Sequence, residues 1–386
     1  MIEVYDKSST HSGVGKTGAN IKVVGIGGGG NNAVDRMIED QLYNVDFIAV
    51  NTDHQVLERS RAGTRIQIGD KLTRGLGAGG DPDIGRNAAE ETRDEIAKAI
   101  AGTDLLFITA GMGGGTGTGG APVIAEIAKS MDIRTIGVVT KPFNFEGKPR
   151  MNNAVTGIAE LKKHVDTLVV IPNQKLLEIV EKDTSFMQAL KKADEILCQG
   201  VQAISDLITK DGIINVDFAD VSTIMQIKGM AHMGVGRASG KNRTTMAAEL
   251  AIRSPLLETS INGAMSVLIS LAASHDLGLM EASSAAEVIG EAVDPDASII
   301  FGTTINDDLG DEVVITVFAT GLEKTDSYIP SLRPSRDMLQ TPADSENSDG
   351  QGRPGSDAQV KVIRKFKPTG DEEDPIQIPS FLSTKR

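Results

Sequence analysis

The sequence has 386 residues, enough for two or three domains, or for two domains and a tail. Its formal net charge of −14 repels nucleic-acid phosphates and anionic lipid surfaces, and it has no tryptophan and only three tyrosines on which bases could stack. Composition therefore argues against a nucleic-acid-binding protein.

Residues 1–19 are polar and turn-rich, and we expect a flexible N-terminal extension there. The run GVGKT (Gly13–Thr17) resembles the end of a Walker A loop, but Thr10 stands where that motif needs its first glycine. The run also precedes the first buried strand instead of following one. We therefore expect no phosphate contact from this extension.

Apolar strands alternate with helices from residue 20 to residue 184, which predicts a parallel sheet wound on both faces. Such sheets bind ligands at the carboxyl ends of their strands. The first expected helix covers Asn32–Asp40. The expected strands are Ile21–Ile26, Phe47–Asp53, the apolar start of Asp104–Gly120, Thr135–Phe143 and Thr167–Asn173.

Two glycine-rich loops follow strands of this sheet and precede helices, namely Gly27–Gly30, followed by two asparagines, and Gly113–Gly119. Glycines let backbone N–H groups approach an anion closely, and a helix N-terminus adds partial positive charge. Thr116 and Thr118 can donate hydroxyl hydrogen bonds. The second loop in particular predicts phosphate binding.

The first loop alone leaves a second interpretation open, because GIGGGG also fits the G-x-G-x-x-G fingerprint of dinucleotide enzymes. Asp53 would then bind the ribose of an NAD-type cofactor. Two further segments, Gly75–Pro82 and Lys141–Arg150, also lie near strand ends, and the latter offers Glu146 for ribose hydroxyls and Arg150 for phosphate. Together these loops favour one nucleotide wrapped on several sides.

Apolar residues recur at helical spacing from Ser185 to Asp211, and Gly212 is the expected stop. One long central helix is therefore predicted over residues 185–212. Beyond it, residues 213–328 mix strands and helices and predict a second, smaller α/β domain.

Cys198 is the single cysteine, so no internal disulfide is possible, and no CxxC or Cys/His cluster indicates a zinc site; a cytoplasmic protein is expected. No signal-like start and no apolar stretch of membrane-spanning length occur in the sequence, so any membrane association is expected to come from a partner. Residues 329–373 are rich in Ser, Asp, Pro, Gly and Gln and predict a disordered linker. Residues 374–386 regain apolar side chains and predict a docking peptide, whose candidate contacts are Ile376, Ile378, Pro379, Phe381 and Leu382.

Asp217 and Asp220 lie three residues apart in NVDFADV, at an expected turn into a helix. Such aspartates most often cap a helix. They could also polarise a water molecule or hold magnesium. The sequence around them leaves both roles open.

Taken together, GGGGNN, GGGTGTG, KPFNFEGKPR and NVDFADV resemble the signature motifs of the tubulin-like GTPases, and most closely those of the FtsZ family of cell-division proteins. The resemblance covers Asn20–Thr320 and extends to the terminal peptide. It implies a tubulin-like Rossmann-type GTPase domain, a long central helix, a second smaller α/β domain and a disordered C-terminal tail.

The resemblance also implies GTP hydrolysis coupled to head-to-tail polymerisation into the protofilaments of the division ring, with Mg²⁺ on the phosphates and a membrane-anchoring division protein bound to the tail peptide. Asn173 and Asp194 would contact guanine, Glu146 and Arg150 ribose and phosphate. The phosphate contacts would come from Gly28, Gly29, Gly30, Asn31, Asn32, Gly114, Gly115, Thr116, Gly117, Thr118 and Gly119.

The long helix bears on the two aspartates. If Asp194 contacts the base, the roughly 18 residues from it to Gly212 rise about 27 Å, at about 1.5 Å per residue. Asp217 and Asp220, with Asn215 positioning their loop, could then act only on the GTP of a neighbouring subunit, in a contact that repeats into a filament. Two alternatives remain at this point: an NAD-type oxidoreductase and a GTP-binding scaffold that does not polymerise.

Overall fold

The computed structural model describes residues 19–178, 184–210, 212–225, 229–257 and 260–322. The predicted N-terminal extension up to residue 18, the linker and the docking peptide lie outside these residues. None of the described helices is both long enough and apolar enough to cross a membrane.

The elements that precede the long helix are, in chain order, β1 (Ile21–Ile26), α1 (Gly27–Glu39), β2 (Val45–Asn51), α2 (His54–Arg59), β3 (Thr64–Gln67), α3 (Asp70–Thr73), α4 (Pro82–Glu91), α5 (Arg93–Ile100), β4 (Leu105–Gly111), α6 (Thr116–Ser130), β5 (Arg134–Lys141), η1 (Asn144–Glu146), α7 (Lys148–Leu161), β6 (Thr167–Pro172) and α8 (Asn173–Leu176). They are followed by α9 (Phe186–Thr209), α10 (Phe218–Met225), β7 (Gly229–Ser239), α11 (Arg243–Ile252), β8 (Ser266–Ala273), α12 (Leu279–Gly290), β9 (Ser298–Ile305), η2 (Asp307–Leu309) and β10 (Glu312–Thr320).

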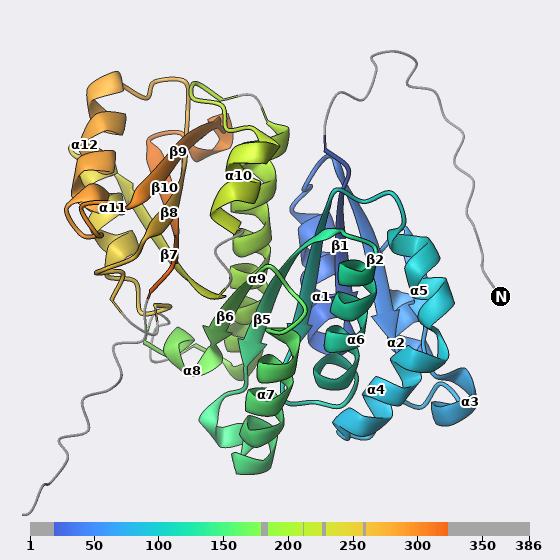
Figure 1. Ribbon diagram of the computed structural model, residues 1–386. Helices are drawn as coiled ribbons and strands as arrows, with labels where there is room; N and C mark the ends of the chain where they lie inside the picture. The colour runs from blue at the N-terminus through green and yellow to red at the C-terminus, as the bar shows by residue number, and fades with distance from the viewer. Residues whose placement is uncertain (1–18, 179–183, 211, 226–228, 258–259, 323–386) are drawn as a thin grey trace, which may run out of the picture. The chain divides into compact units, whose positions relative to one another are not determined.

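The described strands form one ten-stranded sheet in the order β3-β2-β1-β4-β5-β6-β7-β10-β8-β9 (Figure 1). The strands from β3 to β6 are all parallel, as the alternation of strands and helices predicted. β7 continues the sheet through a short parallel pairing with β6, from Thr167↔Gly229 to Val169↔Ala231. Beyond it, β10 runs antiparallel between β7 and β8, and β9 pairs in parallel with β8.

Helices cover both faces of the parallel part of the sheet. Successive residues of a strand point to opposite faces, so Val23 of β1 joins a core with α1 and α9, whereas Val24 joins a core with α4, α5, α6 and α7. A third core packs α11 and α12 against one face of β7, β8 and β10. Each fully buried Val, Leu or Ile contributes about 1.5–3 kcal/mol of transfer free energy.

The predicted long helix is confirmed as α9, which begins after Ser185. The Ser185 side chain accepts a hydrogen bond from the Gln188 N–H, and the Gln188 side chain accepts one from the Ser185 N–H, which together form a capping box. Val201 and Leu207 of α9 share a core with Phe107 of β4 and with Phe318 of β10. The helix thus joins the parallel strands to the mixed strands through one continuous core.

The expected start of the first helix was wrong. It was placed at Asn32, after a glycine loop, but α1 already begins at Gly27. A Cβ on Gly30 would lie 2.4 Å from the Thr109 carbonyl oxygen, and one on Gly29 would lie 3.3 Å from the backbone of Gly111. These glycines therefore form the first turn of α1, which packs tightly onto β4. The close contact with β4 outweighs the low helix propensity of glycine.

Gly212 was expected to stop the long helix, but α9 already ends at Thr209. A Cβ on Gly212 would lie 1.7 Å from the Thr303 carbonyl oxygen. The position therefore requires glycine because the loop after α9 presses against β9.

Candidate nucleotide-binding site

A pocket of about 280 Å³ opens at the carboxyl ends of β1, β4, β5 and β6, the edge at which parallel sheets bind ligands. Its walls come from the starts of α1 and α6, the η1–α7 segment, α8 and one face of α9. The lining residues are Gly27, Gly28, Gly29, Asn32, Gly111, Met112, Gly114, Gly115, Thr116, Gly117, Thr140, Pro142, Glu146, Arg150, Asn173, Leu190, Ala193, Asp194 and Leu197.

The N-termini of two long helices meet at this pocket. Gly27 has a φ of 73°, and a Cβ there would lie 2.9 Å from the backbone nitrogen of Gly117, the second residue of α6. The first-turn N–H groups of both helices have no partner within their own helix, and both helix dipoles are positive at this end. This arrangement suits the phosphates of a nucleotide.

Side chains at the two helix starts complete the anion-binding end. Thr116 shares a 2.7 Å hydrogen bond with the hydroxyl of Thr52, which fixes its rotamer at the pocket wall. Asn32 is exposed on the first helix. A Cβ on Gly28 would meet nothing within 4 Å, so the space in front of α1 is open.

The segment around η1 forms another wall. The Glu146 Oε1 atom accepts a 2.8 Å hydrogen bond from the Phe143 N–H, and Arg150 lies one helical turn on, with its Nε atom 3.0 Å from Glu146 Oε2. The Asn144 N–H donates to Gln174 Oε1, which ties this segment to α8. The ion pair places one acceptor and one cationic donor together at the rim.

Asn173 and Asp194 supply acceptors at the α8–α9 wall. The Asn173 Oδ1 atom is buried without a hydrogen-bond partner, which is costly unless a ligand donates to it. Asp194 lies between Leu190 and Leu197, and desolvation by burial raises its pKa to about 7, opposed by the charge of Arg36. Two acceptors against an apolar wall suit a base edge that carries N–H donors.

Four residues predicted for the phosphates do not line this pocket. Asn31 is buried and holds the fold together, because its Nδ2 donates to the Gly25 carbonyl oxygen and its Oδ1 accepts from Asn51. Gly30 packs on β4, as described above. Thr118 accepts a 2.7 Å hydrogen bond from the Gly113 N–H, and a Cβ on Gly119 would lie 1.9 Å from the Pro82 carbonyl oxygen.

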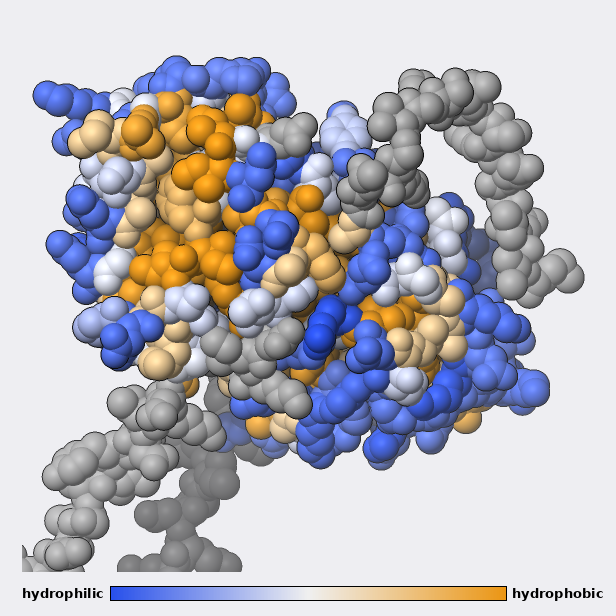
Figure 2. Space-filling model, turned by 45° about the horizontal axis from the view of Figure 1, so that its top comes forward, coloured by the Kyte–Doolittle hydropathy of each residue, from blue (hydrophilic) through white to orange (hydrophobic). Residues whose placement is uncertain are grey.

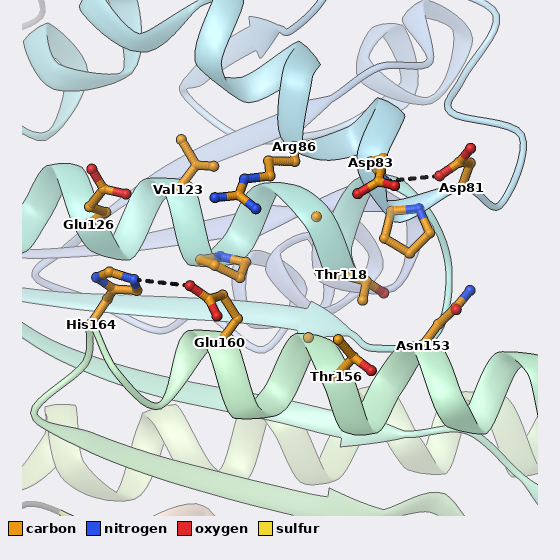
Figure 3. A pocket seen from close by; sticks show the side chains of 14 residues that line it. Asp81, Asp83, Arg86, Thr118, Val123, Glu126, Asn153, Thr156, Glu160 and His164 are labelled. Carbon is orange, nitrogen blue, oxygen red and sulfur yellow. Dashed lines mark hydrogen bonds and ion pairs between the residues drawn. The ribbon is translucent and has the colours of Figure 1, made fainter.

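Thr118 and Gly119 instead line a second, larger pocket of about 400 Å³ between α4, α6 and α7 (Figure 3). Its walls are mostly side chains, and the charged ones include both signs: Arg86 points into it, and Glu160 lies 3.6 Å from His164. It borders α6 only from the third residue onward, whereas the smaller pocket is lined by the first two residues of α6 and the first turn of α1. The smaller pocket therefore has the features of a phosphate site, and the larger one lacks them.

The loop that carries Asn215, Asp217 and Asp220 lies away from the nucleotide pocket. The Asn215 Oδ1 atom accepts from the Gly212 N–H, and Asp217 Oδ1 accepts a 2.7 Å hydrogen bond from the Asp220 N–H at the start of α10. Asp217 thus caps α10, as the plainer interpretation predicted. α10 lies at the opposite end of α9 from α8 (Figure 1), so the aspartates are remote from the Asp194 wall.

Comparison with known proteins gives the family. Residues 20–181 match the GTPase domain of the Tubulin/FtsZ family, and residues 229–323 match the C-terminal domain of the FtsZ family. A solved FtsZ dimer from M. jannaschii is 48% identical over 80% of this chain and 90% of its own, with a TM-score of 0.78. The chain belongs to the tubulin/FtsZ family.

More distant relatives share the fold. CetZ1 from Haloferax volcanii, solved as a GDP-bound monomer, is 22% identical over 80% of this chain and 96% of its own, with a TM-score of 0.68. CetZ2 from the same organism, solved as a GTPγS-bound protofilament, is 19% identical over 80% and 94%, with a TM-score of 0.69.

Family membership makes the chain a GTPase of the polymer-forming tubulin/FtsZ family and excludes the oxidoreductase alternative. Asp53, the candidate ribose ligand of that alternative, caps α2 by accepting from the Gln55 N–H and does not line the pocket. The predicted family and fold class are confirmed.

Sequence reasoning missed part of the pocket lining. Met112, Thr140 and Pro142 lie at the carboxyl ends of predicted strands, and the rule that ligands bind at strand ends could have indicated them. Leu190, Ala193 and Leu197 lie at helical spacing around Asp194, so helix geometry alone would have placed them on the same face.

Proposed function

We propose that this GTPase binds GTP in the pocket between α1, α6 and α9 and hydrolyses it only when the Asn215–Asp220 loop of a second copy completes the site. The observation that carries the proposal is the incomplete pocket. Among the described residues that line it, the only acidic ones are Glu146, which pairs with Arg150, and Asp194, which lies against apolar residues of α9. No carboxylate of the described lining is left to orient an attacking water at the phosphates.

In this proposal, Asp217 and Asp220 polarise the water and Asn215 holds their loop. The first turns of α1 and α6 bind the phosphates through Gly28, Gly29, Asn32 and the residues from Gly114 to Gly117, Glu146 and Arg150 contact ribose and phosphate, and Asn173 and Asp194 read guanine. Mg²⁺ would neutralise the phosphates and help to hold the leaving group. No group of three His, Cys, Asp or Glu side chains among the described residues could hold a metal ion, which fits a magnesium bound chiefly by phosphates and water.

Exposed apolar side chains lie at both ends of the proposed contact. Phe145 is 60% exposed beside the pocket. Leu279 and Met280, 80% and 76% exposed, follow β8 at the end where the 212–214 loop meets Thr303 of β9. Figure 2 shows apolar side chains gathered on the part of the surface formed by the elements from α10 to α12. Two different apolar surfaces suit a head-to-tail contact, which repeats into a filament.

The FtsZ dimer at 48% identity supports self-association of this chain. We further propose that the filaments form the cytoplasmic division ring at mid-cell. A membrane-anchoring division protein would bind Ile376, Ile378, Pro379, Phe381 and Leu382, which lie outside the described residues.

The decisive experiment mixes two inactive variants. Asp217→Ala keeps the nucleotide pocket but removes the loop carboxylate that is proposed to act on the neighbour's GTP. Gly28→Glu has room for its side chain but places a negative charge at the phosphates, so it keeps the loop and loses GTP binding; Gly28→Ala is its matched control. We expect neither variant to hydrolyse GTP alone and the mixture to do so, with wild-type activity per molecule rising steeply with protein concentration. Activity that is independent of concentration, or a mixture as inactive as its parts, would refute the shared site.

A further inference from the structure

One edge of the sheet is open. β9 is the last strand in the sheet order and pairs with β8 alone among the described strands. The Ser298 N–H donates to the Met265 carbonyl oxygen on the β8 side, so the backbone groups of the next residue and of every second residue after it point outward. These residues are Ile299, Phe301 and Thr303.

Part of this edge already pairs with another segment. The Thr303 N–H donates a 3.0 Å hydrogen bond to the Ile214 carbonyl oxygen, and the Ile214 N–H donates to Thr303 Oγ1 at 2.8 Å. Nothing comparable is present at Ile299 and Phe301 within the described residues, and the Ile299 side chain is 40% exposed. An apolar strand edge whose backbone groups are only partly paired can accept one more strand.

The described chain ends close to this open edge. Thr320 at the end of β10 pairs with Ser266, and Ser266 pairs with Ser298 at the start of β9. With strands about 4.8 Å apart, the tail leaves the body roughly 10 Å from the free edge.

The tail contains one run with the composition of a strand, VKVIRKFK (Val360–Lys367). It combines four β-branched or aromatic residues with four basic residues, inside a tail that is otherwise mostly polar or acidic. The ends of β9 carry the opposite charge: Asp294 and Asp296 precede it, and Asp307 and Asp308 follow it.

We propose that Val360–Lys367 docks on the Ile299–Phe301 edge of β9 in its own chain as an eleventh strand. The roughly 37 residues between the described body and this segment span about 35 Å on average, so the edge is well within reach and the effective concentration is of millimolar order. Docking leaves six linker residues, 368–373, before the terminal peptide. The peptide is then presented close to the body instead of at the end of a long tether.

Hydrogen exchange on the full-length, GDP-bound, dilute protein tests the docking without requiring assembly. Ile363→Pro removes a backbone donor and breaks the added strand, and Ser348→Pro is the matched control in the linker. We expect the Ile299 and Phe301 amides to exchange at least about tenfold faster in Ile363→Pro than in the wild type and in Ser348→Pro. The Thr303 amide, already bonded to Ile214, serves as an internal reference. Equal exchange in all three proteins would overturn the proposal.

Cross-linking tests the strand geometry. Ile299→Cys is combined in turn with a cysteine at each of Lys361, Val362, Ile363, Arg364 and Lys365, and with Ser348→Cys as control. The native Cys198 is buried and does not interfere. We expect disulfides within single chains at alternating positions, because side chains of a strand alternate in direction. Cross-links that do not alternate, or that join two chains, would contradict docking of the chain on its own β9.

Discussion

Two buried asparagines differ in whether their side chains have hydrogen-bond partners. The Asn31 side chain donates a hydrogen bond through Nδ2 and accepts one through Oδ1. The Oδ1 atom of Asn173, by contrast, is buried without a partner. A paired buried amide stabilises the fold, and an unpaired one costs stability until a ligand satisfies it. We therefore predict that Asn173 serves nucleotide binding and not the stability of the fold.

The two asparagines should respond oppositely to truncation. Asn31→Ala is expected to lower the free energy of unfolding by about 1–3 kcal/mol, because it removes two buried hydrogen bonds, one to the Gly25 carbonyl oxygen and one from the Asn51 side chain. Asn173→Ala is expected to leave the melting temperature of the nucleotide-free protein unchanged or higher and to weaken GDP binding about tenfold or more. Thermal melts and calorimetric titration distinguish the two, and an Asn173→Ala protein that melts early but binds normally would show a purely structural role.

If Asp194 contacts guanine as proposed, nucleotide binding should depend on pH near neutrality. Burial raises its pKa to about 7, well above the usual aspartate value, so the folded protein without nucleotide binds a proton at pH values where the unfolded chain does not. The contribution of this group to the stability of the nucleotide-free protein therefore increases as the pH falls through about 7. Guanine needs the ionised acceptor, so we expect GDP affinity to fall, by at most about tenfold per pH unit, over the same range.

The control for this pH dependence is Asp206, whose pKa burial also raises but which does not line the pocket. Asp194→Asn should give weaker binding with a flat pH profile between about 5.5 and 8. Asp206→Asn should keep the wild-type profile. An unchanged pH profile in Asp194→Asn would contradict a direct contact between Asp194 and the base.

At the scale of elements, the sequence predicted those with a strong pattern. β1, β4, β5 and β6 are mostly apolar runs, and α9 has both a capping box and a regular apolar face. β7 was not predicted, because it is glycine-rich. Its Gly234 and Gly236 lie where a Cβ would come within 2.1 and 2.0 Å of carbonyl oxygens of α11, a packing requirement that no local pattern reveals.

In the candidate site, too, some features could be predicted from the sequence and others could not. In the first turns of α1 and α6, the residues that face the pocket are of the same types as those that pack behind it, namely glycine, asparagine and threonine. Residue type therefore could not distinguish Gly28 from Gly30, or Asn32 from Asn31. Only the packing of these turns on β4 and α4 decides it. The remote position of Asp217, by contrast, follows from the length of α9 alone.

The loop after α9 allows a prediction for this element. Gly212→Ala places a Cβ against the Thr303 carbonyl oxygen, so the loop must move away from β9 and carry Asn215 and Asp217 with it. We expect GTPase activity to fall at least about tenfold at every protein concentration while GDP affinity stays at the wild-type value. Gly63→Ala, at a position with open space around it, is the matched control. Wild-type activity in Gly212→Ala would show that the position of this loop is not needed for hydrolysis.

For the molecule as a whole, α9 separates the nucleotide pocket at one end from the loop with Asp217 and Asp220 at the other. Under the proposed function these are two half-sites that only different copies can bring together, so the chain should gain activity by assembly. The exposed Phe145, Leu279 and Met280 give the proposed contact an apolar character. Net charge opposes this contact, because each copy carries −14.

The balance between these two effects predicts a salt dependence. Raising KCl from about 0.05 M to about 0.5 M shortens the range of electrostatic repulsion to a few ångströms, whereas apolar contacts are not weakened. We therefore expect the critical concentration for GTP-dependent pelleting to decrease with salt in the wild type. Leu279→Ser should raise the critical concentration at every salt level, whereas Leu72→Ser, at an exposed position on α3, should leave it unchanged. A critical concentration that increases with salt would mean that ion pairs, and not the apolar side chains, hold neighbouring subunits together.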